Sequence, residues 1–114
     1  MTWTLQRGNK YGAKRHEYNG YTYHSKLEAG YAAELDLRLR AKDIIGWRRQ
    51  VPLDIQVNGK DICTYRIDFI VEYADGTEDW VEIKGLETPE WKLKWKLTEA
   101  LWGDDKNIRL IVQK

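Results

Sequence analysis

The dipeptide Asn58-Gly59 constrains the fold more than any other feature, because it lies between two long segments rich in β-branched and apolar residues. Both residues readily take the positive φ angles that a two-residue hairpin turn requires. The flanking segments, about 44–57 and 61–73, are therefore predicted to be antiparallel neighbours in one sheet.

Further start and stop signals complete an α-β-β-β-α-β order. Ser25 and Glu28 occupy the ends of a capping box, and Thr88 followed by Pro89 is typical of a helix start. The fold class is therefore α/β or α+β, with a mixed central sheet flanked by helices. The expected elements are a helix over about 25–42, strands over about 44–57, 61–73 and 78–84, a helix over about 88–102 and a strand over 107–113.

Length and composition narrow the class of protein. With 114 residues the chain fits a single domain over 1–114. It has no run of about 18 apolar residues, so no membrane-spanning helix is expected. The lone Cys63 excludes an intramolecular disulfide and a cysteine-based zinc site. A reducing cytoplasm is the expected location.

Charge is unevenly distributed, although the net charge is only +1. Residues 1–20 are expected to form an irregular basic arm, because glycines interrupt them. Positive charge near one end and carboxylates further along suit a protein that holds both a phosphate backbone and a metal ion. A solvated tail is the alternative. The basic residues of segment 1–26 are Arg7, Lys10, Lys14, Arg15 and Lys26.

Two predicted strands carry a set of charged residues. Residues two apart on a strand point to the same side, so Glu82 and Lys84 project together. On the preceding strand, Asp68 is expected on the side opposite Ile67 and Phe69. The alternative interpretation is a solvent-facing side of the sheet with alternating charges.

The turn between these strands decides whether Asp68 meets Glu82. A two-residue loop at 75–76 would send the two carboxylates to opposite sides of the sheet. A three-residue loop over 74–76 makes them opposite neighbours, and it needs a left-handed residue at its third position. Gly76 supplies that residue, and the same register aligns the apolar side chains in one face. We therefore expect the three-residue loop.

Carboxylates with Cβ atoms about 5 Å apart repel each other unless a cation joins them or one is protonated. Mg²⁺ (or Mn²⁺) suits such a pair, since it takes one or two carboxylates and completes its shell with water and substrate phosphate. Bound there, the metal would activate water and polarise a phosphate. Lys84 is placed to orient or deprotonate that water, or to stabilise charge on phosphorus.

Glu28 has two interpretations. On a helical wheel it falls within an apolar stripe that includes Leu27, Leu35 and Leu39, so it faces the sheet and needs a partner. There it would be a metal ligand or would fix a metal-bound water. As the last residue of the capping box, it could instead fold back on Ser25.

This ordered set of a helix glutamate, a strand aspartate and an E-x-K strand resembles the PD-(D/E)xK nuclease superfamily. The resemblance implies an αβββαβ restriction-endonuclease-like core and Mg²⁺-dependent cleavage of DNA. It assigns catalytic roles by position, although Ile67 stands where the superfamily name places proline. The catalytic residues so implied are Glu28, Asp68, Glu82 and Lys84, and the metal ligands are Asp68, Glu82 and Glu28.

More narrowly, residues 18–102 resemble a small family of proteins from tailed phages and prophages. Superfamily relatives include dimeric Holliday-junction resolvases, so the resemblance implies branched DNA, a homodimer and, for a phage protein, the host cytoplasm. Gln50 belongs to the matched set without a physical role of its own. The matching stretches are 23–29 (YHSKLEA), 33–37 (AELDL), 50–53 (QVPL), 67–69 (IDF) and 81–88 (VEIKGLET).

The second predicted helix has two apolar stripes. One must pack on the sheet, and the other must meet either a second subunit or residues 1–20. Lys92 and Lys96, one turn apart, either contact phosphates or form a solvated face. The stripes are Trp91, Trp95 and Trp102 on one side, and Leu93, Leu97, Ala100 and Leu101 on the other.

A metal-dependent endonuclease is thus the first functional hypothesis. Its expected partners are DNA and a second copy of the chain, without a membrane or a small-molecule cofactor. The second hypothesis is a nuclease-like module that binds DNA or a protein without cleaving, and the third is a homodimeric interaction protein. A pure binder has no reason to keep a repulsive carboxylate pair, so the sequence favours the enzyme.

Overall fold

The computed structural model describes the chain at residues 25–83 and 87–114, and the backbone alone at 16–18 and 21–23. It divides into two compact units, Met1–Leu37 and Arg38–Lys114, and each is described by itself. None of the helices in these described ranges is long and apolar enough to cross a membrane.

In the first unit, strand β1 (His16–Tyr18) pairs antiparallel with β2 (Tyr21–Tyr23). The expectation that residues 1–20 are irregular is therefore wrong for β1, because a three-residue strand is too short to show a clear alternation. Helix α2 (Lys26–Arg40) begins in this unit, and the hydroxyl of Ser25 accepts the backbone N–H of Glu28 at 3.0 Å, as the capping box predicts.

The buried face of α2 is centred where the helical wheel places it. Glu28, Ala32 and Leu35 are its buried residues. Leu27 and Leu39, at the margins of the predicted stripe, are 44% and 39% exposed. A carboxylate thus lies on the buried face of an otherwise amphipathic helix.

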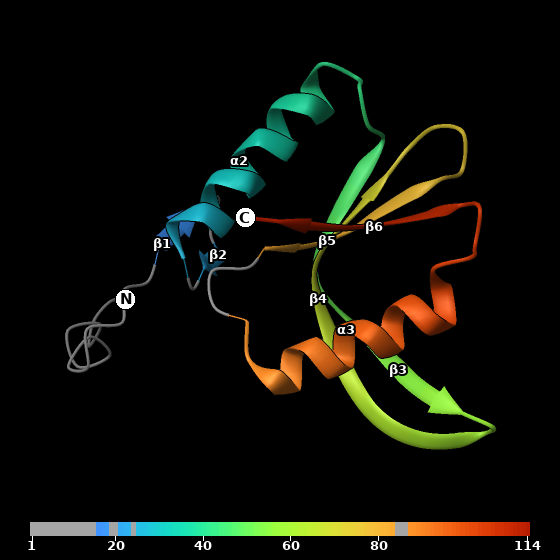
Figure 1. Ribbon diagram of the computed structural model, residues 1–114. Coiled ribbons are helices and arrows are strands. Elements are labelled where there is room, and N and C mark those ends of the chain that lie inside the picture. Colours follow the sequence, from blue (N-terminus) through green and yellow to red (C-terminus); the bar gives the residue numbers. More distant parts are fainter. Residues whose placement is uncertain (1–15, 19–20, 24, 84–86) are drawn as a thin grey trace, which may run out of the picture. The chain divides into compact units, whose positions relative to one another are not determined.

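The second unit is built on a four-stranded mixed sheet in the order β3-β4-β5-β6 (Figure 1). The first three strands are antiparallel, and β6 runs parallel to β5 after a crossover through α3. The predicted αβββαβ order and the α+β class are confirmed. The bounds are β3 (Gly46–Val57), β4 (Lys60–Glu72), β5 (Glu78–Ile83), α3 (Pro89–Trp102) and β6 (Ile108–Gln113).

Helix α3 covers the sheet with its tryptophan stripe. Its start is as predicted, because the hydroxyl of Thr88 accepts the N–H of Trp91 at 3.1 Å. Trp91 and Trp95 are buried in the core, whereas Leu93 remains 60% exposed. The apolar residues that share this core with the two tryptophans are Leu53, Ile55, Tyr65, Ile67, Ile70 and Trp80.

The turn between β4 and β5 is the predicted three-residue loop. The N–H of Tyr73 bonds the carbonyl of Thr77 at 3.0 Å, and Gly76 has a φ of +91°. This turn sets the register that pairs Phe69 with Val81. The ladder ends at that pair, so Asp68 and Glu82 are adjacent to it but are not the ladder pair that was expected.

The side-to-side alternation of β4 is interrupted near Asp68. Ile67 and Ile70 both belong to the core under α3 although they lie an odd number of residues apart, whereas Phe69 contacts the ring of Trp47 instead. The prediction that Ile67 and Phe69 share a face is therefore wrong. On the paired strand β3, Gln50 has a positive φ of 50°, which marks a break at the same level of the sheet.

Replacing Gly76 with alanine is expected to destabilise the protein by about 1 kcal/mol, because a side chain at positive φ is strained. A Cβ there would meet no atom within 4 Å, so the effect is conformational alone. Gly30→Ala is the matched control, since Gly30 lies in α2 with equally open space and should stabilise by up to about 1 kcal/mol. Urea denaturation gives the free energy of unfolding of both variants. A change of the same sign in both would contradict the prediction.

Candidate active site

The half-buried Asp68 carboxylate lies where β4 and β5 separate. One of its oxygens, Oδ2, accepts the backbone N–H of Ile83 at 2.8 Å. The other, Oδ1, accepts the side-chain amide of Gln50 at 3.1 Å. Two donors from two neighbouring strands therefore fix the orientation of this carboxylate.

Glu82 is only 4% exposed. The pKa of Tyr65 lies above its ordinary value, first because the phenol is buried, and then because the carboxylates of Glu82 and Asp68 are near it. The same phenol oxygen accepts the indole N–H of Trp91 at 2.9 Å. Tyr65 thus joins α3 to the part of the sheet that carries the two strand carboxylates.

The structure brings together only part of the predicted set. Asp68 and Glu82 share the environment of Tyr65, as their register requires. Glu28 is buried on the portion of α2 that belongs to the first unit, which is described separately from the sheet. Lys84 lies outside the described residues. Of the predicted DNA-contacting residues, Lys26, Lys92 and Lys96 are exposed, and Lys10, Lys14 and Arg15 lie outside the described residues.

Two carboxylates are the donor set available for a metal here. Among residues 25–83 and 87–114, no group of three or more His, Cys, Asp or Glu side chains could hold a metal ion. Each oxygen of Asp68 accepts one described hydrogen bond and has a second lone pair. Mg²⁺ needs only one or two protein carboxylates. The pair of Asp68 and Glu82 therefore fits a hard divalent cation that keeps water and phosphate ligands.

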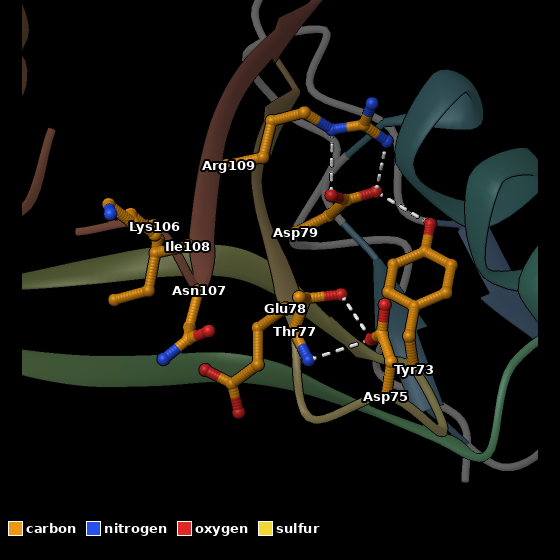
Figure 2. A pocket seen from close by; sticks show the side chains of 9 residues that line it. All are labelled: Tyr73, Asp75, Thr77, Glu78, Asp79, Lys106, Asn107, Ile108 and Arg109. Atoms are coloured by element: carbon orange, nitrogen blue, oxygen red, sulfur yellow. Dashed lines mark hydrogen bonds and ion pairs between the residues drawn. The ribbon is translucent and has the colours of Figure 1, made fainter. Parts of the chain in front are cut away.

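A second candidate region, a hollow of about 340 Å³ beside the β4–β5 turn, is lined by charged and uncharged residues from two segments, 73–79 and 106–109 (Figure 2). Its buried carboxylate, Asp79, accepts two hydrogen bonds from Arg109 at 2.9 Å and one from the hydroxyl of Tyr73 at 2.7 Å. Arg38 in turn donates to Tyr73 at 3.0 Å. The charge of Asp79 is therefore compensated by a guanidinium of the same fold.

Residues 8–113 match the family described as protein of unknown function, DUF1064. The chain belongs to the DUF1064 family. No curated protein and no solved structure matches it. The matched range includes both strand carboxylates and Gln50, so the site lies within the part of the chain that defines the DUF1064 family.

Gln50 is the residue of this DUF1064 site whose role the sequence did not reveal. Its amide connects β3 to Asp68, and its positive φ coincides with the break in alternation. Substitution Gln50→Glu would place a carboxylate against Asp68 and is expected to cost about 1–3 kcal/mol of stability at neutral pH, because a charged hydrogen bond is lost and a like charge is added.

The matched control for this substitution is Gln56→Glu. Gln56 also joins β3 to a β4 carboxylate, since its amide donates to Asp61 at 2.7 Å, but both residues are exposed. Its replacement should cost no more than about 0.5 kcal/mol, since solvent screens exposed charges. If urea denaturation gave equal losses of unfolding free energy for the two variants, Gln50 would have no special role at Asp68.

Proposed function

We propose that the chain is a divalent-metal-dependent DNA endonuclease that hydrolyses phosphodiester bonds. The observation that carries this proposal is that Asp68 and Glu82 adjoin the last pair of the β4–β5 ladder, where Asp68 accepts the N–H of Ile83 at 2.8 Å. Buried or half-buried carboxylates near each other are unfavourable without a cation. The resemblance to PD-(D/E)xK nucleases, with the same order of elements, supports phosphodiester cleavage as the reaction.

In this proposal Asp68 and Glu82 hold Mg²⁺ or Mn²⁺, which when bound supplies an activated water and charge stabilisation at the phosphate. Gln50 and the N–H of Ile83 hold Asp68 in one orientation, so little conformational freedom is lost on binding. Lys84 orients the attacking water or stabilises the negative charge on phosphorus. Glu28 is the further metal ligand that the resemblance implies.

Branched DNA is the proposed substrate, in keeping with the resemblance to Holliday-junction resolvases, and a homodimer is the proposed assembly. Lys92 and Lys96 are exposed one turn apart on α3 and supply phosphate contacts. Lys26 and the basic residues Lys10, Lys14 and Arg15 add positive charge near the N-terminus. The cytoplasm, of the host in the case of a phage protein, is the proposed location.

A cleavage assay with Mg²⁺ or Mn²⁺ tests the activity on duplex, single-stranded, flap and four-way-junction DNA. The wild type is expected to cleave, and Glu82→Gln is expected to lower the rate by at least about 100-fold, because stabilisation by a bound metal is worth several kcal/mol. Asp54→Asn is the control, since Asp54 is an exposed carboxylate of the same hairpin. Tight binding with no cleavage of any substrate would favour the binding module instead.

The salt dependence of binding tests the contacts from α3. Replacing Lys92 and Lys96 with glutamine should weaken DNA binding for all sequences and lower the slope of log K against log salt by about 0.9 per lost contact. Lys106→Gln is the control, because this exposed lysine lies beside β6 and is not part of α3. Unchanged slopes in the α3 variants would place the DNA on another surface.

A further inference from the structure

Gln50 has a backbone conformation that is unusual inside a strand. Three of the described residues other than glycine have a positive φ, namely Lys42 at 63°, Gln50 at 50° and Asn58 at 53°. Lys42 and Asn58 lie in turns, whereas Gln50 lies within β3. A glutamine at positive φ is strained, because its Cβ crowds the following carbonyl oxygen. Strain of this kind persists only where the surrounding structure holds the residue in place.

Strand β3 changes sides at the level of Gln50. The β3–β4 ladder places Gln50 directly opposite Asp68, although the two are not themselves a ladder pair. Val51 packs against the core under α3, whereas Trp47, four residues away, contacts Phe69 instead. Residues four apart on a regular strand share a side. The side of the strand therefore changes within an interval that contains the positive φ of Gln50.

The side chain of Gln50 connects this strained position to the candidate site. Its amide Nε2 donates to Oδ1 of Asp68 at 3.1 Å, while the backbone N–H of Ile83 donates to Oδ2 at 2.8 Å. The bond from Ile83 alone would leave the carboxylate free to rotate about one oxygen, whereas a second donor on the other oxygen fixes its plane. Backbone strain at a residue that fixes a candidate ligand is typical of a functional position.

We propose that Gln50 is a positioning residue whose left-handed backbone presets the carboxylate of Asp68 for a divalent cation, although the strain lowers the stability of the fold. This inference rests on the proposed function, because the cation is the one that Asp68 and Glu82 hold there. It extends the site to a third strand, β3, and assigns the strain at Gln50 to binding. Stability and binding then respond differently to changes at this residue.

Two substitutions separate the backbone of Gln50 from its amide. Gln50→Ala and Gln50→Gly both remove the donor to Asp68, but only the glycine relieves the strain at positive φ. We expect Gln50→Gly to unfold a few degrees above Gln50→Ala, the reverse of the usual order within a strand. Both variants should bind Mn²⁺ in the absence of DNA about tenfold more weakly than the wild type, or worse, the usual effect of losing an outer-shell partner. Isothermal titration calorimetry gives the affinities, and thermal unfolding gives the stabilities.

Gln56→Ala is the matched control. Gln56 also joins β3 to a carboxylate of β4, since its amide donates to Asp61 at 2.7 Å, but both residues are exposed. The Mn²⁺ affinity of Gln56→Ala should equal that of the wild type.

The outcomes separate this inference from the proposed function. Failure of the wild type to bind Mn²⁺ overturns the metal-dependent function and the positioning role together. Wild-type affinity in Gln50→Ala and Gln50→Gly overturns the positioning role and leaves the metal site in place. If Gln50→Ala does not fold, the affinity of Gln50→Gly decides.

Stability supplies the other outcomes that overturn the inference. If Gln50→Gly is no more stable than Gln50→Ala, the backbone of Gln50 is not strained. If Mn²⁺ affinity follows the unfolding temperature across the variants, or falls as far in Gln56→Ala, the effect is one of general stability and Gln50 has no positioning role.

Discussion

The hydrogen bond from the backbone N–H of Ile83 to the carboxylate of Asp68 determines where β4 and β5 part. Beyond the pair of Phe69 and Val81, the side chain of Asp68 accepts the N–H of Ile83 in place of a backbone carbonyl of β4. β4 can therefore continue into its long hairpin with β3 while β5 ends (Figure 1).

Two buried carboxylates of this sheet show how differently such groups are stabilised. Asp79 is 6% exposed and meets the guanidinium of Arg109 at 2.9 Å through both of its oxygens. Glu82 is 4% exposed and lies on the same strand, with the phenol of Tyr65 and the carboxylate of Asp68 near it. The first arrangement compensates a charge within the fold. The second brings two carboxylates to one part of the sheet, which is the property expected of a metal site.

Local signals predicted the elements and the turns because each depends on a few adjacent residues. The three-residue loop that ends at Gly76 predicts the register that pairs Phe69 with Val81, and the structure has this pair. Trp91 and Trp95 were expected to face either the sheet or another surface, since helical periodicity defines a face without saying what covers it. Their contacts with Tyr65 come from a strand distant in sequence, so only the folded chain reveals them.

The partnership of Gln50 with Asp68 could not be predicted, because it depends on a bulge. The turn at Asn58-Gly59 pairs Val57 with Lys60, and continuing that register would place Gln50 opposite Ile67. An irregularity between Ile55 and Gln56 shifts the pairing by one residue and brings Gln50 opposite Asp68. A one-residue shift exchanges the two faces of a strand, so the site depends on this bulge.

Helix α3 connects the two requirements of the proposed nuclease. Its inward residues Trp91 and Trp95 pack around Tyr65, which lies near Glu82. Lys92 and Lys96 follow these tryptophans directly in sequence and lie about 100° further around the helix, where both are exposed. Because a helix is rigid over one turn, the same four residues fix the distance between the proposed phosphate-binding surface and the carboxylate site. A DNA backbone held by the lysines would therefore lie at a constant distance from Glu82.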